Sequence, residues 1–336
     1  MVTVRQAEKF AQMVKDADNI LIVGHVNPDG DCIGSTTAMR DYLGKHKKVR
    51  IAVPTKYPGF LTFLDPENEI LIYRRNIEGV KAAVDEADLI ICMDFNRLYR
   101  IEELGELVRA SGARKILIDH HPDPEDFADL TISETEVSSA SELTYWLLKM
   151  SGLGEISVSV LNSLYTGMMT DSNNFSNSVY PSTFQMASEL IAAGVDKEKI
   201  QFNVFNSYSE NRMRLMGHAL LNEMTVYPEF GCAFISLSKE ILEKYDFQDG
   251  DTEGFVNLPL LIKGIEVSGF FREGDDYIRV SLRSRTDKFS VNDFSHKYFN
   301  GGGHERAAGG RLYMPIEDVK SHFEKAIKEY CKGKDI

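Results

Sequence analysis

Short apolar runs that alternate with helix-forming segments constrain the fold of this chain more than any other feature. The runs cover residues 20–23, 49–53, 89–93 and 115–118. Strands of this kind are buried on both faces, which is typical of a parallel sheet covered by helices on both sides. The sequence therefore predicts an α/β fold with an N-terminal, mostly parallel sheet, a helical connector and a smaller α/β C-terminal domain.

Polar side chains follow three of these runs at the point where each run ends. His25, Asp29 and Asp31 follow the first run, Asp94 follows the third, and residues 119–121 (Asp-His-His) follow the fourth. The carboxyl ends of parallel strands meet at one edge of a sheet, where ligands of open α/β sheets bind. We therefore expect these side chains to gather at one edge. The turn residues around Asp29 predict a loop, with a helix starting near Ser35.

The residue types at this edge suit a divalent metal ion. Histidine and aspartate favour a borderline-to-hard ion such as Mn²⁺ over one that prefers thiolate. A site with two ions about 3.5–4 Å apart needs a bridging carboxylate and further ligands on each side. The chain offers six candidate ligands: His25, Asp29, Asp31, Asp94, His120 and Asp171. Each alone could be a turn residue, a helix cap or a hydrogen-bonded loop residue, but together they favour a metal site.

Two stretches in the last third of the chain could bind an anion. The glycines Gly301, Gly302 and Gly303 precede His304, and such a run lets backbone N–H groups face an anion or simply forms a tight turn. Arg283 and Ser284 end an expected strand, where they could clamp a phosphate or lie on a solvated edge. Arg100, six residues after Asp94, could face the metal site or begin the next helix.

Length and charge limit the organisation and the partners. With 336 residues the chain is long for one core, and we expect a domain over 1–194, a helical connector over 195–215 and a second domain over 216–336. The net charge of −13 disfavours long duplex nucleic acid. The four cysteines lie far apart without a CxxC motif, and neither a signal peptide nor an apolar run of membrane-spanning length is recognisable. We therefore expect a cytoplasmic protein without a membrane association.

The motifs together resemble a known family. His25-x-x-x-Asp29-x-Asp31, Asp94, Asp119-His120-His121, Asp171 and Gly301-Gly-Gly-His304 resemble, in order and spacing, the motifs of the DHH/DHHA1 phosphoesterases. The bacterial nano-RNase and pAp-phosphatase branch is the most similar, and the resemblance spans nearly the whole chain.

The resemblance implies a site with two divalent ions, Mn²⁺ in the first place, with Mg²⁺ or Co²⁺ as alternatives. One ion would be held by His25, Asp29 and Asp94, and the other by Asp31, Asp94, His120 and Asp171, so that Asp94 bridges. Asp119 would orient a ligand histidine, and His121 would contact the scissile phosphate or assist the leaving oxygen. Substrate binding is expected from Arg100, Arg283, Ser284, Gly301, Gly302, Gly303 and His304.

The implied activity is hydrolysis of oligoribonucleotides of two to a few nucleotides to mononucleotides, of adenosine 3′,5′-bisphosphate (pAp) to AMP, or of both. A hydroxide that bridges the two ions would attack phosphorus. The alternatives are linear or cyclic dinucleotides (pGpG, pApA, cyclic di-AMP) as the main substrate, and a nucleotide-binding protein without catalysis. Family members are often dimers, so the resemblance also implies a homodimer.

Overall fold

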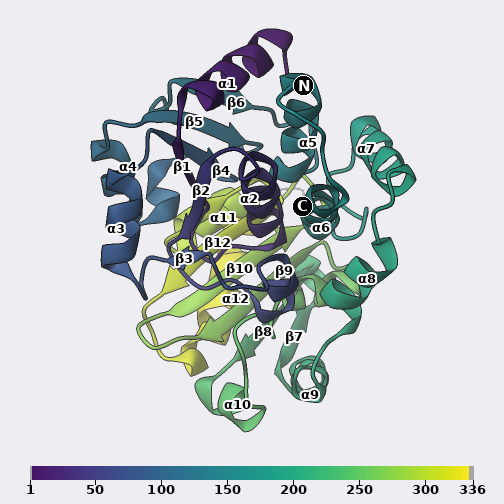
Figure 1. The fold of residues 1–336 in the computed structure, drawn as a ribbon. Coiled ribbons are helices and arrows are strands. Elements are labelled where there is room, and N and C mark those ends of the chain that lie inside the picture. The colour runs from purple at the N-terminus through teal and green to yellow at the C-terminus, as the bar shows by residue number, and fades with distance from the viewer. Residues whose placement is uncertain (1, 333–336) are drawn as a thin grey trace. The chain divides into compact units, whose positions relative to one another are not determined.

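The computed structural model describes residues 2–332, which form two compact units that divide between Ser207 and Tyr208 (Figure 1). The division lies inside segment 195–215, where we expected the connector. That segment holds the short helix α8 (Lys197–Gln201), a π-helical turn over Phe202–Asn206 and most of α9 (Glu210–His218).

The first unit is built on a six-stranded sheet in which every neighbouring pair is parallel. The strand order is β3-β2-β1-β4-β5-β6. The strands are β1 (Asn19–Val23), β2 (Lys48–Val53), β3 (Leu71–Ile72), β4 (Leu89–Met93), β5 (Arg114–Asp119) and β6 (Leu130–Ser133). The chain order reverses between β1 and β4, so this pair forms the switch point at which open α/β sheets bind ligands.

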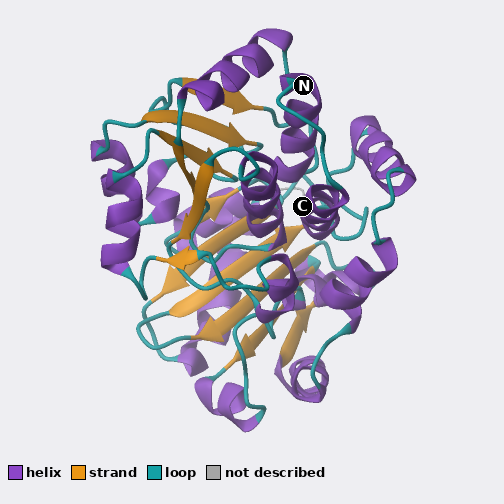
Figure 2. Ribbon diagram, in the orientation of Figure 1, coloured by secondary structure: helices purple, strands orange, loops and turns teal. Residues whose placement is uncertain are grey.

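Helices cover both faces of this sheet, as the continuous apolar runs predicted (Figure 2). In β1, Ile20 and Ile22 belong to one core and Leu21 and Val23 to the other, because successive side chains of a strand point to opposite faces. The first core contains residues of α1 (Val4–Asp16), α2 (Gly30–Leu43), α5 (Ala140–Ser151), α6 (Val158–Asp171) and α7 (Pro181–Ala192); the second contains residues of α3 (Ile77–Asp85) and α4 (Glu103–Ala110). The predicted α/β architecture is confirmed.

Helix α2 begins five residues earlier than predicted. Its first residue is Gly30 rather than Ser35, because the Asp29 side chain accepts hydrogen bonds from the N–H groups of Asp31 and Cys32 (3.0 and 3.1 Å) and caps the helix. Asp31 therefore lies in the first turn of the helix. The predicted loop at this position is wrong.

The second unit contains another six-stranded sheet, in the order β11-β12-β10-β9-β8-β7. Only the β8–β9 pair of these described strands is parallel. The strands are β7 (Met224–Tyr227), β8 (Cys232–Leu237), β9 (Val267–Glu273), β10 (Ile278–Ser284), β11 (Gly302–Gly303) and β12 (Ala307–Leu312). Helices α11 (Val291–Tyr298) and α12 (Val319–Cys331) share an apolar core with one face of this sheet.

The opposite face of the second sheet is covered only in part. Its apolar cover contains Leu215 of α9, Leu242 of α10 (Lys239–Lys244) and Phe255, and the strand residues in this core come from β8 and β9. None of the helices in residues 2–332 is long and apolar enough to cross a membrane.

Candidate metal centre

Asp94 lies at the centre of the predicted cluster. It follows β4 directly, is only 2% exposed, and adopts a left-handed backbone conformation with a φ of 63°. Its N–H donates to the carbonyl of Ile118 on the neighbouring strand β5 (3.0 Å). Aspartate tolerates this conformation better than most residues, but a buried residue held there indicates a constrained position.

The two oxygens of Asp94 face two different histidines. Oδ2 lies 3.3 Å from Nε2 of His25, which follows β1, and Oδ1 lies 3.6 Å from Nε2 of His120, which follows β5. These two strands flank β4 on either side, so the sheet order itself places one carboxylate between two imidazoles. The bridging role of Asp94 stays a prediction, which the position of its two oxygens supports.

The remaining candidate ligands surround these three residues. Asp29 Oδ1 lies 3.8 Å from His25 Nε2. On the other side, Asp171 Oδ2 and Asp31 Oδ2 lie 3.6 and 4.0 Å from His120 Nε2. The structure therefore brings together all six side chains that the sequence nominated.

Asp31 reaches this position through the amino terminus of α5. Its carboxylate accepts hydrogen bonds from the backbone N–H groups of Ala140 (2.6 Å) and Ser141 (2.9 Å), and it is 1% exposed. Because these bonds come from a helix amino terminus, they stabilise a negative charge that would otherwise be costly to bury.

Glycines allow α6 to approach α2 closely enough to place Asp171. A Cβ on Gly34 would lie 2.6 Å from the carbonyl oxygen of Ser163 and 2.8 Å from the nitrogen of Gly167. A Cβ on Gly167 would lie 2.8 Å from Asp31 Oδ1. The two helices therefore lie so close together that only glycine, which has no Cβ, fits at these two positions. Asp171 is the last residue of α6, so this close packing determines where its carboxylate lies.

Four carboxylates and two imidazoles make up this cluster, so carboxylates outnumber histidines. Burial, together with the charges of Asp94 and Asp171, raises the pKa of Asp31 well above its usual range. Burial, partly offset by His120, raises the pKa of Asp171 to about 6. Burial lowers the pKa of His25, but the carboxylates of Asp29 and Asp94 outweigh it and raise that pKa to about 10. The raised pKa values reflect this excess of carboxylates, and the oxygen-rich donor set fits divalent cations.

Asp119 holds a different histidine from the one implied by the resemblance. Its Oδ1 accepts from Nδ1 of His121 (2.7 Å) and its Oδ2 from the backbone N–H of His121 (3.0 Å), whereas the candidate ligand is His120. Asp119 is fully buried, so this pair of bonds fixes the ring of His121. His121 Nδ1 lies 4.0 Å from Asp94 Oδ1, at the edge of the cluster.

Cys32 is a neighbour of the site that sequence reasoning missed. Donor atoms of His25, Cys32 and Asp94 lie within 4.8 Å of one another. The thiol is fully buried, and burial raises its pKa well above the usual value. The only available signal was its place directly after Asp31, in a helical turn that we had interpreted as a loop.

Arg100 has a structural contact with the loop of the site. Its carbonyl accepts a hydrogen bond from the N–H of Val26 (2.9 Å), next to His25. Its Nε is buried and lacks a hydrogen-bond partner among residues 2–332. In the described part of the chain, the hydrogen bonds of Arg100 involve none of the six candidate ligands.

The other predicted binding residues lie in the second unit. Ser284 Oγ donates to the carbonyl of Thr286 (2.7 Å), and the N–H of Gly303 donates to Asn292 Oδ1 (2.8 Å). Gly302 and Gly303 form the short strand β11, which pairs with β12. Gly303 has a φ of 155°, and a Cβ there would lie 2.5 Å from the carbonyl oxygen of Ala307, so glycine is required.

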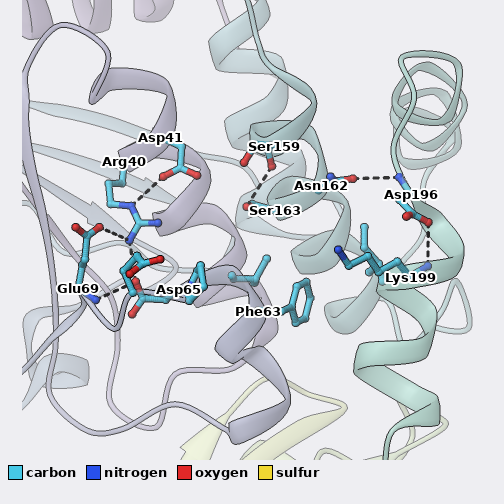
Figure 3. Close-up of a pocket in the computed structure, with 14 residues that line it drawn as sticks. Arg40, Asp41, Phe63, Asp65, Glu69, Ser159, Asn162, Ser163, Asp196 and Lys199 are labelled. Atoms are coloured by element: carbon cyan, nitrogen blue, oxygen red, sulfur yellow. Dashed lines mark hydrogen bonds and ion pairs between the residues drawn. The ribbon is translucent and has the colours of Figure 1, made fainter.

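A separate cavity of about 270 Å³ in the first unit does not belong to this centre (Figure 3). Arg40 pairs there with Asp65 (Nη1 to Oδ1, 2.9 Å), and Tyr57 donates to the other oxygen of Asp65 (2.9 Å). None of the six candidate metal ligands lines this cavity, and its buried charges are paired with each other.

The first unit is a parallel α/β sheet with a histidine–aspartate cluster at its switch point, and a second α/β unit follows it in the chain. This order of units and the position of the cluster are those expected from the family that the sequence resembles. The chain belongs to the DHH family: residues 19–170 match the DHH family, N-terminal domain, and residues 233–333 match the DHHA1 domain. The resemblance seen in the sequence is confirmed.

Relatives and a solved structure match this chain over nearly its full length. The bifunctional oligoribonuclease and PAP phosphatase NrnA of Bacillus subtilis is 30% identical, covering 93% of this chain and 96% of that protein. A probable bifunctional oligoribonuclease and PAP phosphatase of Streptococcus mutans is 28% identical, covering 94% and 97%. The crystal structure of an exopolyphosphatase-related protein from Bacteroides fragilis is 43% identical and superimposes with a TM-score of 0.93, covering 98% of this chain and 97% of the other.

Proposed function

We propose that this protein is a metal-dependent phosphoesterase that hydrolyses oligoribonucleotides of two to a few nucleotides to mononucleotides, and pAp to AMP. The observation that carries the proposal is the position of Asp94, whose two oxygens face His25 and His120 from neighbouring strand ends. Full-length relatives named for these two activities support the choice of substrate.

Two divalent cations, Mn²⁺ in the first place, fit the donor set. His25, Asp29 and Asp94 would hold one, and Asp31, Asp94, His120 and Asp171 the other. When bound, such cations neutralise charge on phosphate oxygens and lower the pKa of a water molecule that attacks phosphorus. Asp31 is held by the amino terminus of α5 and Asp29 by capping α2, so both carboxylates are oriented before a cation arrives.

The Asp119–His121 pair positions a proton donor in this proposal. Because Asp119 accepts from Nδ1 of His121, the Nε2 edge of the ring is directed away from Asp119. In this proposal, that edge of the ring contacts the scissile phosphate or assists the leaving 3′-oxygen. The second unit would anchor the nucleotide through Arg283, Ser284 and the segment from Gly301 to His304.

The test is turnover of pAp, pApA, a long single-stranded RNA and pyrophosphate side by side, with Mn²⁺ and again after chelation. We expect hydrolysis of pAp and of the dinucleotide only, lost with the chelator. Turnover of pyrophosphate alone would contradict the proposed substrate, and turnover that survives chelation would contradict the metal centre. Cyclic di-AMP and pGpG belong in the same panel, because a strong preference for either would make it the main substrate.

Homodimerisation stays a prediction, which light scattering checks.

A further inference from the structure

One face of the second sheet carries charged side chains along strand β10. Along β10, Ile278, Val280 and Leu282 point into the core shared with α11 and α12. The alternate residues point to the other face, and there Arg279 is exposed while Ser281 and Arg283 are half-buried.

Three arginines form a row across this face. The register places Arg279 on β10 directly opposite Arg272 on β9 and directly opposite Arg311 on β12. Directly opposite side chains of an antiparallel pair lie about 4.5–5.5 Å apart at Cβ, and like charges in such pairs destabilise a sheet. Within residues 2–332, neither the guanidinium group of Arg272 nor that of Arg279 forms an ion pair, and that of Arg272 lies 4.8 Å from the centroid of the Phe247 ring. An anion between them would remove this repulsion.

Aromatic rings continue the row. Tyr277 precedes Arg279 by two residues and Tyr313 follows Arg311 by two, so both lie on the same face. They adjoin the last registered pair, Ile278 opposite Leu312. Their ring centroids are 6.2 Å apart. The Arg311 guanidinium lies 4.8 Å from the centroid of Tyr277, and Tyr313 is 68% exposed. Arginines interleaved with an exposed aromatic ring are the elements with which proteins bind single-stranded nucleic acid.

We propose that this surface, the Arg–Tyr face (Arg272, Tyr277, Arg279, Arg311 and Tyr313), binds the distal nucleotides of a single-stranded oligoribonucleotide, with the guanidinium groups on its phosphates and Tyr313 stacked on a base. The inference rests on the proposed function, in which Arg283 anchors a nucleotide close to the reacting phosphate. Arg279 stands four residues from Arg283 on β10, about 13 Å along the strand, a distance on the order of two nucleotides. Oligonucleotides longer than a dinucleotide would therefore reach the Arg–Tyr face, whereas pAp and pApA would not.

The experiment measures binding of a fluorescent pentaribonucleotide and a fluorescent dinucleotide by anisotropy, with chelator present so that no hydrolysis occurs. We expect Arg279→Gln to weaken pentanucleotide binding about fivefold or more and to reduce the dependence of log affinity on log salt by about 0.7. Tyr313→Ala should weaken it about fivefold or more, and Tyr313→Phe should bind like the wild type. Lys320→Gln on α12, whose core lies on the other face of the sheet, is the matched control and should have no effect.

Three results would overturn the inference. The first is an unchanged pentanucleotide affinity in Arg279→Gln. The second is an equal loss for the dinucleotide and the pentanucleotide, because the face would then not act on distal nucleotides. The third is a loss in Arg279→Gln without a loss in Tyr313→Ala, together with competition by inorganic polyphosphate, because this marks a general polyanion site. Failure of the wild type to hydrolyse pAp would count against the proposed function alone, since the binding assay contains no turnover.

Discussion

At the scale of single residues, position 94 requires two properties of its side chain and backbone. The residue must place a carboxylate between two imidazoles, and it must tolerate a left-handed backbone conformation. Asp94→Asn keeps the side-chain volume and a residue that tolerates positive φ, and removes only the charge. We expect turnover of pAp to fall more than about 100-fold, because several kcal/mol of metal-dependent stabilisation would be lost. Calorimetric titration with Mn²⁺ should show weakened binding.

The matched control is Asp123→Asn, since Asp123 is also an aspartate at positive φ (54°) but is exposed. It should retain wild-type turnover and Mn²⁺ affinity. Wild-type turnover in Asp94→Asn would exclude Asp94 as the bridging ligand.

Asp171 makes the effect of metal dependent on pH. Its pKa of about 6 in the metal-free protein lies above the ordinary aspartate value, so the folded state holds this proton more tightly than the unfolded state does. The stabilisation that the proton on Asp171 contributes to the folded state is complete below the ordinary aspartate pKa, and it is lost as the pH rises through about 6. A bound cation must displace the proton below pH 6 and replaces its stabilising effect above it. We therefore expect the increase in Tm caused by Mn²⁺ to grow as the pH rises through 6. An increase that is constant across this range, measured by calorimetry, would contradict this assignment.

At the scale of elements, the contact between α2 and α6 determines where Asp171 lies. In Gly34→Ala the added methyl group meets backbone atoms of Ser163 and Gly167, which no rotamer change can relieve. We expect the free energy of unfolding to fall by about 1–3 kcal/mol, and Mn²⁺ affinity to fall as α6 moves away. Urea unfolding and metal titration measure the two effects.

Gly217→Ala is the control for this substitution, because Gly217 lies in helix α9 with no atom within 4 Å of an added Cβ. Replacing a helical glycine by alanine in open space should stabilise by about 0.5–1 kcal/mol. Destabilisation of both variants to the same extent would show that the α2–α6 contact is not special.

The elements also show what a sequence can and cannot reveal. Strands β1, β2, β4 and β5 were predictable because buried parallel strands are apolar on both faces, and several candidate metal ligands were recognisable because they follow these strands. Strand β6 was not predicted, because it is short and only every second residue is buried. The start of α2 was missed because a Pro-Asp-Gly-Asp segment has turn chemistry, and only the capping bonds of Asp29 convert it to helix. The Arg272–Arg279–Arg311 row was not visible because register, and not sequence distance, places those side chains together.

At the scale of the whole molecule, each unit has apolar cores of its own. We therefore expect two fragments, one ending at Ser207 and one beginning at Tyr208, to unfold cooperatively as separate proteins. The first fragment should bind Mn²⁺ and not the pentaribonucleotide. The second fragment should bind the pentaribonucleotide and not Mn²⁺. Calorimetry and the anisotropy assay check both. A second fragment that folds but does not bind the pentaribonucleotide would show that the Arg–Tyr face is insufficient alone.

The candidate ligands of the proposed metal centre come from positions as far apart in the chain as His25 and Asp171, on three strand ends and two helices. No partly folded chain that lacks either end of this segment can assemble it. Cation uptake should therefore be one of the last events when the first unit refolds, since contacts this distant in sequence form slowly. If the Co²⁺ absorption band appears at the rate of the slowest refolding phase, binding of the cation reports when the first sheet is complete.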